Sequence, residues 1–144
     1  MTATRNARAH GQHARTRTSS VLWLLYLGDA GLLVASGLIH LHLWDIAYRH
    51  VQTMGVLFLV QVAACLLAAA ALLVTRHILV VIGSALLMAG TAVGFLLART
   101  VGLFGFHLPF TSGLAVTVLV IEIAAVVLLG VTAWLMPKSG RPAA

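Results

Sequence analysis

Charged residues are scarce in this chain of 144 residues. Only 8% of them are Asp, Glu, Lys or Arg, and Asp and Glu together number three. An average soluble domain has about 25% charged residues. With 61% hydrophobic residues and a mean hydropathy of +1.05, the chain has too few polar side chains to cover a soluble core. The composition excludes a soluble enzyme and a disordered chain, and it indicates an integral membrane protein.

Cysteine is almost absent as well. Cys65 is the only one and lies in an apolar segment, so no internal disulfide and no cysteine-rich metal motif can form. This excludes a secreted disulfide scaffold. The formal charge of +6 would indicate nucleic-acid binding in a soluble protein. Here the basic residues lie at the ends of apolar segments and in the first nineteen residues, where they orient membrane proteins. We therefore expect no nucleic-acid partner.

Four apolar segments make up most of the chain. They are Val21–Trp44, Thr53–Thr75, Ile78–Ala98 and Gly113–Met136. Each is long enough for the roughly 20 residues with which a helix crosses a bilayer. Helices are expected because lipid leaves the backbone groups of an isolated strand unpaired. The sequence therefore predicts an all-α fold, a four-helix transmembrane bundle with up-down-up-down topology, forming one domain over residues 21–136.

Two polar tails flank this domain. Residues 1–20 carry four arginines and almost no large apolar side chain, so we expect a disordered basic tail or one lying on anionic lipid. Residues 137–144 form a second, short tail. We interpret residues 21–44 as an uncleaved first span, because they exceed the apolar region of a signal peptide and include Asp29.

The basic residues predict the orientation. Placing both termini in the cytoplasm leaves only Arg49 and Arg99 outside and puts seven basic residues inside: Arg5, Arg8, Arg15, Arg17, Arg76, Lys138 and Arg141. This distribution follows the positive-inside rule. We expect a multi-pass protein of the cell membrane, surrounded by lipid, with both termini cytoplasmic.

Each span carries one polar side chain near the middle of the bilayer: Asp29, Gln61, Thr91 and Glu122. Ionisable groups at this depth are functional candidates. No Lys or Arg lies beside the two carboxyls, and desolvation disfavours their charged form. We therefore expect at least one of them to be protonated at neutral pH. The predicted polar layer is a hydrogen-bonded clasp, which we favour, or a proton or small-cation site, or a layer in which the two carboxyls do not contact each other.

Periodic faces accompany this layer. Tyr26, Asp29, Ser36 and His40 follow helical spacing, so they form a stripe that we expect to face the bundle interior. We favour an interior face over a proton relay. On the second span we interpret one face as packing rather than a cofactor site: Met54, Phe58, Gln61 and Cys65.

Pairs of small residues also recur at helical spacing. Gly90 and Gly94 form a GxxxG pair on the third span, and Gly31 and Ala35 form a similar pair on the first. Such pairs allow helix backbones to approach closely. They suit packing within the chain and a homodimer equally well.

Histidines gather around the predicted outer end of the first span. The candidate metal ligands there are His40, His42, Asp45, His50 and His107. Imidazole binds zinc, copper and iron, and a carboxylate can add an oxygen ligand. However, His40 and His42 point to opposite sides of a helix, so they share a metal only where the helix has unwound. We favour the alternative, in which these residues lie at the membrane interface with Trp44 and Tyr48. Haem ligation is unsupported, since only the first span carries a histidine within or near it.

No catalytic motif is evident. The sequence has no phosphate-binding glycine loop, nucleophile elbow or HExxH motif. We expect a non-enzymatic accessory or structural membrane subunit, in a homo-oligomer or a larger complex, and the sequence indicates no particular cofactor. One alternative is a transition-metal or electron-transfer site at the outer leaflet. The other is a proton-coupled carrier working as an oligomer, because four helices without an internal repeat are few for a lone transporter.

Several segments have a familiar pattern. They are GLIHLHLW at Gly37–Trp44, YRH at Tyr48–His50, QTMGVLFLVQ at Gln52–Gln61 and VGLFGF at Val101–Phe106. Together they resemble a group of small actinobacterial four-helix membrane proteins of unassigned function. The resemblance covers the four spans and not the basic tail. It implies a bacterial cytoplasmic membrane protein and supplies no catalytic residues.

Overall fold

The structure is a computed structural model that describes residues 3–102 and 113–136. These residues are almost entirely helical. They form α1 (Ala3–Leu43), the π-helix η1 (Trp44–Tyr48), α2 (Gln52–Thr75), α3 (Ile78–Thr100) and α4 (Gly113–Leu135). The predicted all-α fold with four long helices is confirmed.

Each long helix contains a segment that is long and apolar enough to cross a membrane. Within the described part of the chain, these segments are Ser20–Tyr48, Thr53–Thr75, Ile78–Thr100 and Gly113–Leu135. They coincide with the predicted spans to within four residues at each end. Large apolar side chains cover the outside of the bundle, as lipid-facing helices require; Val74, for example, is 82% exposed. These features are typical of a small multi-pass membrane protein.

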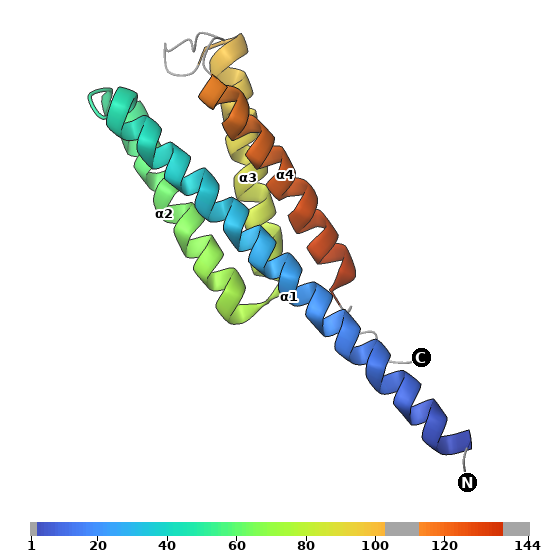
Figure 1. The fold of residues 1–144 in the computed structure, drawn as a ribbon. Helices are drawn as coiled ribbons and strands as arrows, with labels where there is room; N and C mark the ends of the chain where they lie inside the picture. The colour runs from blue at the N-terminus through green and yellow to red at the C-terminus, as the bar shows by residue number, and fades with distance from the viewer. Residues whose placement is uncertain (1–2, 103–112, 137–144) are drawn as a thin grey trace.

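We expected residues 1–20 to be disordered or to lie on anionic lipid. α1 is instead helical from Ala3 and continues beyond the other helices (Figure 1), whereas a position on lipid stays a prediction. The physical reason is that the first span already provides a helical nucleus, so each further residue adds a hydrogen bond without a new nucleation cost. The added segment contains no proline and is rich in alanine and arginine, which favour helix.

The helices pack most closely as the pairs α1–α2, α3–α4 and α1–α4, and among the pairs of neighbouring helices α2 and α3 touch each other least. Glycine permits the close approach of α1 and α2. A Cβ atom on Gly37 would lie 3.2 Å from Cys65 Cβ. Figure 1 places η1 and the start of α4 at one end of the bundle, here called the η1 end, and the α2–α3 turn at the other, here called the Arg76 end.

The Arg76 end is held by a tight turn. Arg76 adopts a left-handed backbone conformation with φ 48°, and the His77 side chain accepts a hydrogen bond from the Leu79 amide at the start of α3. The Arg76 guanidinium lies 3.9 Å from the centre of the Trp23 ring. This cation–π contact joins the turn to α1.

The bundle interior combines aliphatic and polar side chains. The predicted stripe on α1 is confirmed, since all four members are buried: Tyr26, Asp29, Ser36 and His40. Leu33 of α1, Met88 of α3 and Leu129 of α4 are fully buried in the core as well. Asp29 and Glu122 both have 0% exposure, so the two carboxyls predicted inside the bilayer avoid the lipid.

Candidate functional site

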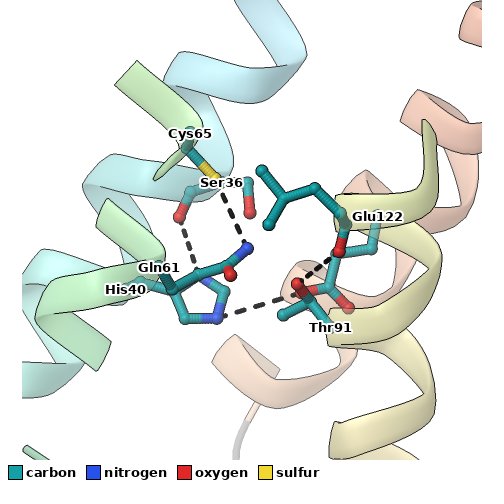
Figure 2. A network of polar contacts seen from close by, with 7 residues as sticks. Ser36, His40, Gln61, Cys65, Thr91 and Glu122 are labelled. Atoms are coloured by element: carbon teal, nitrogen blue, oxygen red, sulfur yellow. Dashed lines mark hydrogen bonds and ion pairs between the residues drawn. The ribbon is translucent and has the colours of Figure 1, made fainter. Parts of the chain in front are cut away.

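Glu122 is the most unusual side chain of the bundle interior. It projects from the middle of α4 and is fully buried, and neither of its carboxyl oxygens has a hydrogen-bond partner among the described residues. His40 of α1 faces it, and His40 Nε2 lies 3.9 Å from Glu122 Oε1 (Figure 2). This distance is too long for a hydrogen bond.

The protonation of His40 follows from its other ring nitrogen. Nδ1 lies 2.9 Å from the backbone carbonyl oxygen of Ser36. Because a carbonyl only accepts, Nδ1 must carry the hydrogen of this bond. In a neutral ring, Nε2 is then an acceptor that faces another acceptor, the Glu122 carboxylate. The pair therefore requires a hydrogen from elsewhere.

This pair lies at the inner limit of a cavity of about 480 Å³. The cavity has contributions from all four long helices. Its polar lining residues are His40, Gln61, Thr91 and Glu122, with Tyr48 and Arg99 towards the η1 end. Most of the remaining wall is apolar, including Met54, Leu57, Phe58, Leu86, Phe95 and Val118. A deep apolar space with a few convergent polar groups is typical of a small-molecule site.

Gln61 and Thr91 have partners within their own helices. The Gln61 amide donates to Cys65 Sγ at 3.4 Å, and the Thr91 hydroxyl donates to the Leu87 carbonyl oxygen at 2.8 Å (Figure 2). Both side chains nevertheless border the cavity and keep acceptor oxygens that these bonds do not use. They can therefore assist Glu122 and His40 in holding a polar group.

Aromatic rings form one wall near the histidine. The centre of the Phe58 ring lies 5.3 Å from that of His40 and 4.6 Å from that of Tyr48. Tyr48 is thus partly buried against Phe58, and its place at the membrane interface stays a prediction. From the sequence, we assigned the helix face that contains Phe58 to packing. The polar Gln61 on the same face was the feature of the sequence that could have indicated a site.

The cavity opens sideways between α2 and α3. Its lining residues Leu57 of α2 and Leu86 of α3 are 42% and 67% exposed, whereas Val118 and Glu122 of α4 are buried. This agrees with the sparse packing of α2 against α3. In a membrane, such an opening faces lipid rather than water.

Glycines enlarge the opening. Gly90 and Gly94 both line the cavity, and a Cβ atom added to either would have no neighbouring heavy atom within 4 Å. The GxxxG pair of α3 therefore makes no close helix–helix contact among the described residues. Its missing side chains leave space beside Thr91.

Asp29 lies elsewhere. It accepts a hydrogen bond of 2.6 Å from the hydroxyl of Thr132, ten residues beyond Glu122 on α4. At 1.5 Å per residue, the two carboxyls are separated by about 15 Å along the bundle. The structure thus divides the predicted central layer into two levels, with Glu122, Gln61 and Thr91 at the cavity and Asp29 nearer the Arg76 end.

The candidate metal ligands are spread over several surfaces. His40 is buried, whereas His42 and Asp45 are exposed. Arg49 pairs with Asp45 at 3.5 Å, and its Nε donates to His50 at 3.0 Å. Within residues 3–102 and 113–136, no three His, Cys, Asp or Glu side chains gather to hold a metal ion. His107 lies outside the described residues, so a metal site that includes it stays a prediction.

Comparison of the chain with known protein families, curated proteins and solved structures finds no match. The resemblance to small actinobacterial membrane proteins therefore stays a prediction. The function has to be argued from the geometry of the cavity.

Proposed function

We propose that this protein is a non-enzymatic, multi-pass protein of the cell membrane that binds a small lipophilic molecule in the cavity between its helices. The observation that carries this proposal is the fully buried Glu122 carboxyl, without a hydrogen-bond partner, at the inner limit of a 480 Å³ apolar cavity. A ligand that reaches Glu122 supplies the partner which the chain does not.

The energetics favour a ligand site over a structural role for Glu122. An unsatisfied buried polar group costs about 1–3 kcal/mol, and more when it is charged. A clasp between helices would offset this cost with hydrogen bonds, as Thr132 does for Asp29. Glu122 has no such bond, and ionisable groups within membrane spans are usually functional. The cavity volume also lies in the usual range for small-molecule sites, about 300–1,000 Å³.

The proposal includes an orientation. With up-down-up-down topology and both termini in the cytoplasm, the Arg76 end faces the cytoplasm and the η1 end faces outward. The excess of basic residues at the termini and at Arg76 supports this arrangement. The cavity then opens into the outer half of the bilayer, and its occupant enters from the lipid through the gap between α2 and α3. An accessory role in a larger complex and a proton-coupled carrier stay predictions.

A neutral photoprobe tests the binding site. The purified protein in lipid nanodiscs is irradiated with 3-trifluoromethyl-3-phenyldiazirine, and labelled residues are mapped by mass spectrometry. Lipid-facing side chains will be labelled in any case, so the informative positions are the buried His40 and Glu122, which the probe reaches only through the cavity. We expect adducts at both.

Two glycine variants complete the test. Gly94→Leu places a side chain in the cavity wall and should reduce labelling of Glu122 by about tenfold, as expected when about 1.4 kcal/mol of binding is lost. Gly83→Leu is the matched control on α3, because a Cβ there also meets nothing within 4 Å but does not border the cavity. Absence of Glu122 adducts in the wild type, or equal labelling in both variants, would refute the proposed site.

A further inference from the structure

We propose that the preferred occupant of the cavity is a compact lipophilic amine in its protonated form, and that this cation replaces one proton held between Glu122 and His40. The inference rests on the proposed function and adds the class of ligand and a proton exchange. It follows from the balance of hydrogen-bond donors and acceptors at the site, from the charges that line the cavity and from its aromatic wall.

The first step concerns the resting site. His40 Nδ1 is committed to the Ser36 carbonyl, so an unprotonated pair presents the Nε2 lone pair and a carboxylate to each other at 3.9 Å. That state has no hydrogen-bond donor between the two groups and leaves a negative charge buried without compensation, which is strongly unfavourable. The resting pair therefore holds one added proton, either on Glu122 or on His40 Nε2. In both forms the pair has no net charge.

The second step concerns the charges around it. The ionisable side chains that line the cavity are His40 from α1, Tyr48 from η1, Arg99 from α3 and Glu122 from α4, while the lining residues of α2 are not ionisable. Arg99 lies eight residues beyond Thr91, or about 12 Å along α3 towards the η1 end. Its guanidinium lies 5.9 Å from the centre of the Phe95 ring. Among the described residues that line the cavity, the one Lys or Arg side chain, Arg99, thus lies towards the η1 end and not beside Glu122.

The third step concerns the ligand. A protonated primary amine brings N–H donors and one positive charge, which are what two facing acceptors lack. When it binds, its N–H groups donate to the Glu122 carboxylate and to His40 Nε2, the shared proton leaves to the aqueous phase, and the net charge of the site is unchanged. A neutral alcohol supplies a single donor and leaves the proton in place. An anion brings no positive charge to compensate the Glu122 carboxylate.

The aromatic wall supports a cation in particular. Phe58 and Tyr48 stack beside His40 and border the same cavity. Aromatic faces attract ammonium groups, and the attraction grows when water is excluded. The apolar residues of α2 and α3 provide the surface for the hydrocarbon part of the ligand.

The test uses three ligands with the same hydrocarbon body. These are 1-adamantylamine, 1-adamantanol and N,N,N-trimethyl-1-adamantylammonium, titrated calorimetrically into the protein in nanodiscs in phosphate and in Tris buffer. The different ionisation enthalpies of the buffers give the number of protons released. We expect the amine to bind about tenfold or more tightly than the alcohol, because charge-assisted hydrogen bonds are stronger than neutral ones. Amine binding should release one proton, and alcohol binding none.

The trimethyl ligand separates charge from hydrogen bonding. It carries the charge without an N–H group, so it should release the proton but bind more weakly than the amine. Glu122→Gln should abolish both the preference for the amine and the proton release. Asp29→Asn is the matched control, since it alters the other buried carboxyl, keeps an acceptor for Thr132 and should leave both properties intact.

The outcomes are distinguishable. Equal binding of amine and alcohol without proton release would overturn the inference while leaving the proposed cavity site in place. Failure of all three ligands, together with absence of Glu122 photolabelling, would overturn both. If Glu122→Gln does not fold, the comparison of the amine with the alcohol on the wild type still decides the matter.

Discussion

Two buried carboxyls with the same chemistry have different surroundings. Asp29 Oδ2 receives the Thr132 hydroxyl, which also lies 3.0 Å from the Leu128 carbonyl oxygen. The Thr132 hydroxyl thus links the Asp29 carboxyl of α1 to α4. Glu122 has no comparable neighbour. At the scale of single residues, Asp29 therefore joins helices, and Glu122 is available to a ligand.

Thr132→Val tests the first of these roles. The substitution keeps the shape of the side chain but removes its link from α4 to Asp29, so the free energy of unfolding should fall by about 0.5–2 kcal/mol, the range of hydrogen bonds between membrane helices. Thr117→Val is the control, because Thr117 is exposed and donates only to the Gly113 carbonyl of its own helix. Unfolding in mixed micelles at increasing SDS measures both. Equal losses for the two variants would contradict the joining role.

Part of the site could be predicted from single residues. Helical spacing on α1 correctly gave a buried stripe that includes Asp29 and His40. We nevertheless also grouped His40 with the exposed histidines, because sequence proximity to His42 outweighed its position four residues after Ser36. The pairing of His40 with Glu122 could not be derived, since it depends on how far α1 and α4 slide past each other.

At the scale of elements, glycines set how closely the helices approach. Gly55 is the tightest case, because a Cβ there would lie 2.8 Å from the Tyr48 carbonyl oxygen. This contact brings η1 against the start of α2 and so positions the aromatic wall of the cavity. The neighbouring atom belongs to the backbone, which cannot move away as a flexible side chain can.

Gly55→Ala should therefore destabilise the fold by about 1–3 kcal/mol, the usual cost of overpacking. Gly83→Ala should be neutral or stabilising by up to about 1 kcal/mol, because alanine favours helix and meets no neighbour there. Thermal unfolding followed by helical circular dichroism measures both variants. An unchanged Gly55→Ala protein would show that η1 does not pack against α2 in this way.

The existence and positions of the four spans could be predicted because continuous apolar length is a local property of sequence. The π-helix could not be predicted, since such turns are rare and residues 44–48 carry no sequence signal for the extra residue in the turn. The cavity was missed for a related reason. Its volume depends on the separation of α2 from α3, and sequence patterns contain no measure of that separation. The glycines that border it suited packing within the chain and a homodimer equally well, whereas among the described residues they border open space and a homodimer stays a prediction.

At the scale of the whole molecule, the orientation in the membrane is open to a direct test. In a Cys65→Ser background, Asp45→Cys lies at the exposed η1 end and Ser139→Cys follows α4. If both termini are cytoplasmic, a membrane-impermeant maleimide added to intact cells should label the cysteine at position 45 and spare that at 139. Permeabilised cells, in which both should react, provide the control. The reverse pattern would place the cavity opening in the inner leaflet.

The sideways opening of the cavity determines what its occupant experiences before binding. A molecule that arrives through the gap between Leu57 and Leu86 is already dissolved in hydrocarbon, so its relevant concentration is its mole fraction among lipids. Strong partitioning raises that value far above the aqueous concentration, and modest intrinsic affinity then suffices for occupancy. Dilution with extra lipid should empty the site even when the total amount of ligand per volume of water is held constant.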